Sequence, residues 1–106
     1  MNMNEYQYQA HQTAIYPKNE GITYTVLGLA SEAGELAGKW KKYIRDGGNN
    51  EAILDAMEAE LGDVLWYVAM IAHELDADLD LIAQRNLDKL SSRANRGKLS
   101  GSGDNR

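Results

Sequence analysis

The sequence predicts an all-α protein built of four helices. Apolar residues recur at a spacing of about 3.6 over two long stretches, as in amphipathic helices. No stretch alternates apolar and polar residues in the manner of a strand. There is one proline, and glycine clusters at two places, Gly47-Gly48 and the C-terminal tail, so the breaks between helices are few. A length of 106 residues predicts one domain.

The first two helices are bounded by proline and by glycine. The first is expected over about residues 4–16 and stops at Pro17, whose ring restricts the residue before it. The second is expected over about residues 22–45 and ends at Asp46-Gly47-Gly48. Its apolar stripe comprises Ile22, Val26, Leu29, Ala33, Leu36, Trp40 and Tyr43.

The last two helices complete the predicted set. The third is expected over about residues 50–75, with Asn49 or Asn50 as its N-cap. The fourth is expected over about residues 78–94, with acids in its first turn and Arg93 near its end, as the helix dipole prefers. The apolar stripe of the third helix comprises Leu54, Met57, Leu61, Val64, Val68, Ala72 and Leu75.

Residues 64–72 are apolar on every side of the third helix. A helix of this kind is covered all round. Four short helices can hardly cover it within one chain, so the back face, with Trp66, is expected to meet another subunit. The sequence therefore predicts a homo-oligomer.

Composition narrows the classes of function. The net charge of −5 argues against general affinity for nucleic acid, although residues 85–106 carry six Lys or Arg against two Asp. The absence of cysteine excludes disulfides and thiolate metal sites. The N-terminus has no signal-peptide pattern, and the longest apolar run is far short of the roughly 20 residues of a membrane span. We expect a cytoplasmic protein without membrane contact.

Four carboxylates occupy matching positions on the second and third helices. Measured from the centre of each apolar stripe, Glu32 and Glu60 lie roughly 80° to the same side. Glu35 and Asp63 lie roughly 140° to that side. If the two helices pack antiparallel, the four groups face one cleft, where their repulsion would be strongly unfavourable without a cation.

Two acid pairs at this spacing indicate a site for a divalent metal, whereas a single pair is usually a solvated helix face. Mg²⁺ and Mn²⁺ prefer oxygen ligands, and Mg²⁺ commonly adds substrate phosphates to its shell. Gly34 stands within the first acid pair, where it costs roughly 1 kcal/mol relative to alanine. We expect this glycine to let a neighbouring backbone or a ligand come near.

Two segments carry a resemblance to a known family. The stretch "GLASEAGEL" followed by "ELGDVLWYV" resembles the MazG-like, all-α nucleoside triphosphate pyrophosphohydrolases. That family carries Glu-x-x-Glu, a spacer of a couple of dozen residues, and then Glu-x-x-Asp. Here the spacer between Glu35 and Glu60 is 24 residues.

A downstream segment extends the resemblance. "NLDKLSSRANRG" is similar to the family's Asn-x-x-Lys-Leu-x-x-Arg segment, matched here by Asn86, Lys89, Leu90 and Arg93. The likeness covers about residues 22–97. It departs at the end, because family members often have Arg-Tyr-Pro where this chain reads Arg-Ala-Asn-Arg, so contacts of the terminal segment are not carried over.

The resemblance implies a four-helix MazG-like bundle over residues 1–97 that is completed by homo-oligomerisation, as a homodimer or homotetramer. Residues 98–106, rich in glycine and serine, are expected to be a flexible tail. The implied reaction is hydrolysis of a (deoxy)nucleoside triphosphate to the monophosphate and pyrophosphate, with Mg²⁺ or Mn²⁺ as the cofactor. The implied metal ligands are Glu32, Glu35, Glu60 and Asp63.

The implied reaction gives roles to further side chains. A carboxylate not fully committed to metal, Glu32 or Glu35, is expected to orient or deprotonate the attacking water. Tyr67, one turn past Asp63, is expected either to contact sugar or base or to pack in the core. Trp40 falls on the core stripe, with stacking on a base as the alternative.

Lys89 and Arg93 share one helix face, with Asn86 one turn earlier, and would hold the outgoing pyrophosphate. The plain alternative is a solvent-exposed basic stripe. Two other functions stay open: a catalytically inactive oligomerisation or regulatory module of the same fold, and nucleic-acid binding through residues 85–98. Intact acids at all four positions favour the enzyme over the first, and the acidic net charge weakens the second.

Overall fold

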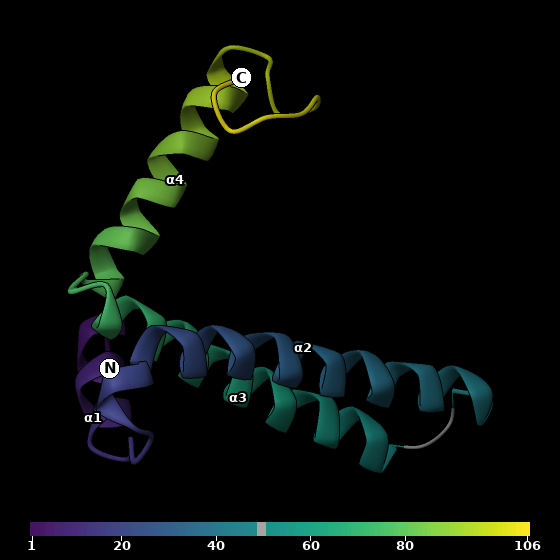
Figure 1. Ribbon diagram of the computed structural model, residues 1–106. Coiled ribbons are helices and arrows are strands. Elements are labelled where there is room, and N and C mark those ends of the chain that lie inside the picture. The colour runs from purple at the N-terminus through teal and green to yellow at the C-terminus, as the bar shows by residue number, and fades with distance from the viewer. Residues whose placement is uncertain (49–50) are drawn as a thin grey trace.

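The computed structural model describes residues 1–48 and 51–106 (Figure 1). Its elements are α1 (Met3–His11), a short 3₁₀ turn η1 (Lys18–Glu20), α2 (Gly21–Arg45), α3 (Glu51–Glu74) and α4 (Leu79–Asn95). No strand occurs in these two ranges, so the all-α prediction is confirmed. The N-cap expected at Asn49 or Asn50 lies outside the described residues.

α2 and α3 form a long antiparallel hairpin, which is the most extensive contact between helices (Figure 1). α2 ends where the sequence predicts. Gly47 and Gly48 adopt positive φ angles of 89° and 72°. The N–H of Gly48 donates to the carbonyl of Tyr43 at 2.8 Å. Glycine enters this left-handed conformation without a steric cost, so this pair stops the helix.

α1 is shorter than predicted, since it ends at His11 and not near Tyr16. The Thr13 hydroxyl donates to the carbonyl of Ala10 at 2.6 Å and so competes with the helical ladder. Tyr16 precedes Pro17, which disfavours the helical conformation for the residue before it. The segment after α1 therefore leaves the helix and runs across α3.

The core lies where α1 crosses the C-terminal half of α3. Ala69, Met70 and Ala72 of α3 are buried there. Trp66, which the sequence places against another subunit, packs in part within its own chain, where its Nε1–H donates to the Thr13 hydroxyl at 2.9 Å. The all-round apolar segment of α3 is thus covered in part by α1 and the residues that follow it.

The buried face of α2 is rotated away from the predicted stripe. Gly21 and Thr25 are buried, whereas Ile22, Val26 and Trp40 are 51%, 48% and 46% exposed. Gly21 and Thr25 are small, so α3 can approach α2 closely. Among the described helices α2 packs chiefly against α3, so the rest of the predicted stripe is left partly uncovered. Trp40 lies outside the core and stacks on the next aromatic of α2, with ring centroids 5.1 Å apart.

Glycines on α2 decide how close the side chains of α3 can come. A Cβ at Gly28 would lie 2.1 Å from the ring of Tyr67, so the ring occupies the space that a side chain would need. Nothing lies within 4 Å of a Cβ at Gly34. The close approach expected at Gly34 therefore occurs at Gly28 within this chain.

α4 leaves the hairpin and does not pack along it (Figure 1). The turn after α3 contains Asp76 at φ 53°. Two side chains of α1 then hold the start of α4: Asn4 Oδ1 accepts from the N–H of Asp80 at 2.9 Å, and Gln7 Oε1 accepts from the N–H of Leu79 at 3.0 Å. The C-terminal half of α4 projects from the rest of the chain, so one copy does not close a four-helix bundle.

The C-terminal residues 98–106 fold back beside the end of α4 (Figure 1). In this conformation Lys89 and Arg93 donate side-chain hydrogen bonds to Asp104 of this segment, for which the sequence predicts a flexible tail. None of the described helices has both the length and the apolar character that a membrane crossing needs.

Candidate metal centre

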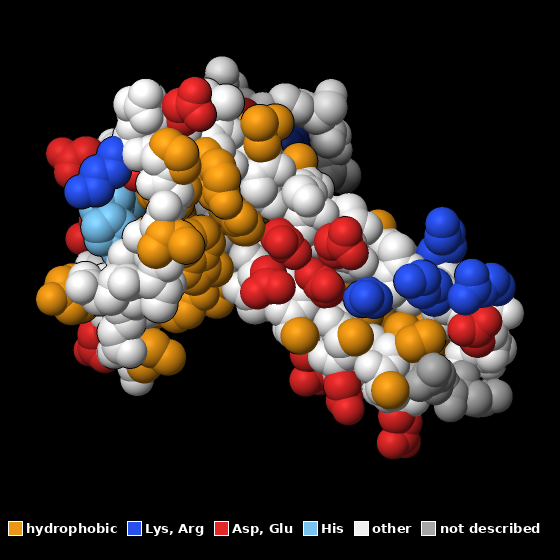
Figure 2. All heavy atoms as spheres, turned by 60° about the horizontal axis from the view of Figure 1, so that its bottom comes forward, with side chains coloured by type: hydrophobic (Ala, Val, Ile, Leu, Met, Phe, Trp, Pro, Cys, Tyr) orange, Lys and Arg blue, Asp and Glu red, His pale blue; other side chains and the backbone are white. Residues whose placement is uncertain are grey.

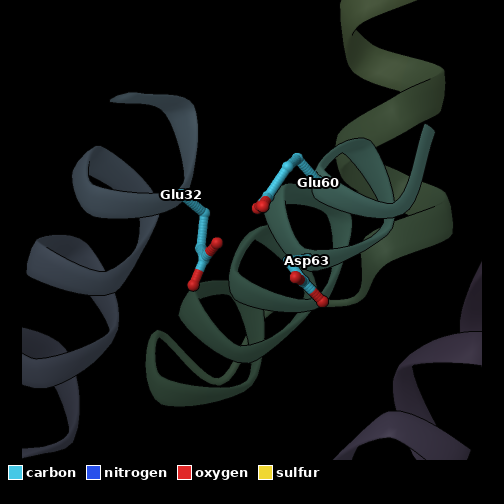
Figure 3. A group of neighbouring side chains, drawn as sticks. All are labelled: Glu32, Glu60 and Asp63. Carbon is cyan, nitrogen blue, oxygen red and sulfur yellow. The ribbon is translucent and has the colours of Figure 1, made fainter. Parts of the chain in front are cut away.

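Three carboxylates meet midway along the hairpin. Glu32 comes from α2, Glu60 and Asp63 come from α3, and the three side chains converge (Figure 3). One oxygen atom of each lies within 4.8 Å of the others. Glu60 and Asp63 share a face of α3 because they are three residues apart, and the antiparallel packing sets Glu32 opposite them. The structure thus joins three of the four predicted ligands.

Glu35 stays outside this group, one turn after Glu32 on α2, and is exposed. The charge of Glu35 still interacts with the cluster, because it is one of the causes that raise the pKa of Glu32. Figure 2 shows acidic side chains gathered in the middle of the molecule, with hydrophobic surface on one side and a row of Lys and Arg side chains on the other. The fourth acid therefore borders the three-carboxylate cluster.

The electrostatics of this cluster favour a cation. A hydrogen bond between Glu32 and Glu60, which forms only when one of the two carboxyls holds a proton, is the main cause that raises the pKa of Glu32; burial and the charges of Glu60, Asp63 and Glu35 add to it. The Glu60 Oε2 atom is buried and has no hydrogen-bond partner among the described residues. Buried acceptors without a partner are rare and costly, and three ionised carboxylates supply one another with no donor. A divalent cation would satisfy all three.

Tyr67 takes the packing role that the sequence left open, and it also lies near the carboxylates. Its ring packs across α2 and lies edge-on to Trp66, with centroids 5.0 Å apart. Burial raises the pKa of Tyr67, as do Tyr24 and the charges of Glu32 and Asp63. Tyr67 is therefore both a packed residue and a neighbour of the carboxylates.

One residue near the cluster was missed by the sequence reasoning. Tyr6 of α1 lies near enough that the charge of Asp63, after burial, raises the pKa of its phenol. No spacing rule connects these two, because they are far apart in the sequence.

The predicted pyrophosphate-binding residues are not brought to the cluster within one chain. Asn86, Lys89 and Arg93 lie on α4, which projects away from the hairpin (Figure 1). Asn86 is exposed, whereas Arg93 is buried, so a simple solvated basic stripe does not describe them either. Lys89 Nζ and Arg93 Nη2 bind the carboxylate of Asp104 at 2.7 Å and 3.0 Å.

Comparison with known proteins identifies the family of this chain. A family model for the MazG nucleotide pyrophosphohydrolase domain matches residues 21–97, which contain α2, α3, α4 and all four carboxylates. The chain is also similar to the gene 37 protein of Mycobacterium phage L5, at 49% identity over 114 residues that cover 100% of each chain. No solved structure gives a significant match. The chain therefore belongs to the MazG nucleotide pyrophosphohydrolase domain family.

Proposed function

We propose that this protein hydrolyses (deoxy)nucleoside triphosphates to the nucleoside monophosphate and pyrophosphate, with Mg²⁺ or Mn²⁺ as its cofactor. Membership of the family supports a nucleotide pyrophosphohydrolase. The observation that carries the proposal is the buried, unpartnered Oε2 atom of Glu60, which lies among two further carboxylates. A buried carboxylate oxygen without a partner is costly, and a bound cation would remove that cost.

Glu32, Glu60 and Asp63 would hold the ion, since hard divalent cations take carboxylate oxygens as ligands. When bound, it would screen the charge of the triphosphate and polarise the phosphoryl oxygens. The chain supplies the frame for this arrangement. Two ligands are fixed on one face of α3, and the packing of Tyr67 over Gly28 sets the spacing to α2.

Glu35 is the residue assigned to take the proton of the attacking water. It borders the cluster, is exposed and lies outside the group of three, so its carboxylate is free to act as a general base. The bond that breaks is the anhydride between the α- and β-phosphates. The water oxygen forms the new bond to phosphorus, Glu35 accepts the water proton, and pyrophosphate leaves with the bonding electrons. Tyr67 is the candidate contact to sugar or base.

The phosphates also need positively charged partners, and the α4 residues predicted for this role do not lie near the carboxylates of their own chain. We assign this role to Asn86, Lys89 and Arg93 of a second copy, in a homodimer or homotetramer. Hydrophobic side chains left without cover on the hairpin support such an assembly, among them Leu61 at 54% exposed. Burial of these side chains would supply the core that a single projecting α4 leaves incomplete.

The test is pyrophosphate release from all eight common NTPs and dNTPs, with Mg²⁺, with Mn²⁺ and with chelator. Glu60→Gln removes the central carboxylate, and Glu58→Gln is its matched control, because Glu58 is exposed on another face of α3. We expect metal-dependent release that Glu60→Gln abolishes and Glu58→Gln retains. A folded protein that binds metal but releases no pyrophosphate would contradict the proposal and favour an inactive regulatory module.

A further inference from the structure

The C-terminal segment returns to α4 through a defined turn. Gly97 follows the helix with a φ of 68°, and the N–H of Lys98 donates to the carbonyl of Arg93 at 2.7 Å. This is the glycine-dependent helix end that satisfies the last carbonyls and reverses the chain. Gly101 and Gly103 also adopt positive φ angles, of 98° and 89°, so the segment bends back on itself. The turns bring its end to the basic face of α4.

Asp104 is the residue that docks. Its Oδ1 accepts from Lys89 Nζ at 2.7 Å and from Arg93 Nη2 at 3.0 Å, and its carbonyl accepts from the same Nη2 at 2.6 Å. Hydrogen bonds from Lys89 and then Arg93 lower the pKa of Asp104 below its usual range. An anion of the chain thus occupies the two cations that the proposed function assigns to the pyrophosphate.

The fit of Asp104 to Arg93 is incomplete. The side chain of Arg93 is 6% exposed, although it lies on the projecting part of α4, so the returning segment covers it. Its Nε is buried and has no hydrogen-bond partner in the described chain. A phosphate group presents several oxygens and can bind the Nε and Nη2 edge of a guanidinium together, which one carboxylate oxygen and a carbonyl on Nη2 do not. The contact is also easily opened, because Asp104 is 77% exposed.

We propose that residues 98–106 are an intramolecular competitor for the phosphate-binding side chains of α4, with Asp104 in the place of a substrate or product phosphate. This inference rests on the proposed function, which assigns Lys89 and Arg93 to the pyrophosphate. The segment must open before the triphosphate engages α4, and it closes again after pyrophosphate leaves. It therefore sets the apparent affinity for the substrate and leaves the carboxylate cluster unchanged.

The test is titration calorimetry of the full-length protein with inorganic pyrophosphate, without divalent metal, so that the carboxylate cluster takes no part. Asp104→Asn removes the docking charge, and Asp88→Asn is the control, because it removes the same charge from α4 but Asp88 contacts Gln84 instead. Exposed ion pairs are weak, so we expect Asp104→Asn to bind pyrophosphate about threefold more tightly. Asp88→Asn should match the wild type, and adding Lys89→Ala to Asp104→Asn should remove the gain.

Nucleotide hydrolysis provides a second readout. The Asp104→Asn variant is expected to show a lower KM at unchanged kcat, because only access to the basic face changes. Equal pyrophosphate affinity of the wild type and Asp104→Asn, or no binding to either, would overturn the inference. In that case metal-dependent hydrolysis lost in Glu60→Gln would still support the proposed function. Absence of hydrolysis in every variant would refute the proposed function instead, whatever the calorimetry shows.

Discussion

Replacing glycine by alanine at two positions of α2 tests how the hairpin is packed. Both sites are within the helix, so alanine gains about 1 kcal/mol of helix propensity at either one. At Gly34 nothing lies within 4 Å of the new Cβ, so Gly34→Ala should stabilise the chain by about 0.5–1 kcal/mol. At Gly28 the new Cβ would lie 2.1 Å from the Tyr67 ring, whereas ordinary contact begins at 3.4 Å.

The Tyr67 ring has to move to admit alanine at Gly28, and Trp66 restricts that movement. Overpacking of this kind typically costs about 1–3 kcal/mol, which exceeds the gain in propensity. After that gain is subtracted, we expect Gly28→Ala to lower the free energy of unfolding by up to about 2 kcal/mol, with a fall in melting temperature of about 4–8 °C for each kcal/mol.

Urea denaturation at low protein concentration measures both variants against the wild type. The two substitutions are chemically identical and lie on one helix, so the expected opposite signs isolate the contact with Tyr67. Stabilisation by Gly28→Ala, or equal effects of the two variants, would refute the packing argument. Activity gives an additional observation, since loss of activity in a stabilised Gly34→Ala variant would indicate that a ligand or second copy approaches Gly34.

Three further results are expected. Tyr16→Phe removes the hydrogen bond from the phenol to Glu74 at 2.8 Å, so the free energy of unfolding should fall by about 1 kcal/mol, whereas Tyr8→Phe, at an exposed ring, should change little. Burial and this bond raise the pKa of Tyr16 to about 12. As the pH rises above 10, Tyr16 therefore loses its proton in the unfolded chain before it does in the folded chain. Between pH 10 and 12 the free energy of unfolding should fall more for the wild type than for Tyr16→Phe. An equal fall with pH in both proteins would contradict this. Mg²⁺ or Mn²⁺ should raise the melting temperature of the wild type and of Glu58→Gln but not of Glu60→Gln, and an equal rise in all three would place the ion elsewhere.

Local patterns were sufficient to predict the order of the helices and most of their ends. The end of α2 at Gly47 and Gly48 depends on backbone conformation that only nearby residues decide. The predicted end of α1 was wrong, because residues 12–16 carry a helical pattern but do not form helix. The Thr13 hydroxyl bonds the carbonyl of Ala10, and Pro17 disfavours helix at the residue before it. The rotation of the α2 stripe escaped prediction, since it depends on which partner helices are present and not on hydrophobicity alone.

The sequence by itself determined which residue types the candidate site contains and at what spacing. The spacing of Glu60 and Asp63 puts both on one helix face whatever the rest of the chain does, and the resemblance implied the metal and the reaction. Only the tertiary structure decided which groups meet. It set Glu32 against the pair on α3, left Glu35 beside them, brought Tyr6 from α1, and turned the basic face of α4 toward the chain's own C-terminal segment. These contacts join residues that are distant in sequence. The packing of whole helices against one another decides them, and no local pattern encodes that packing.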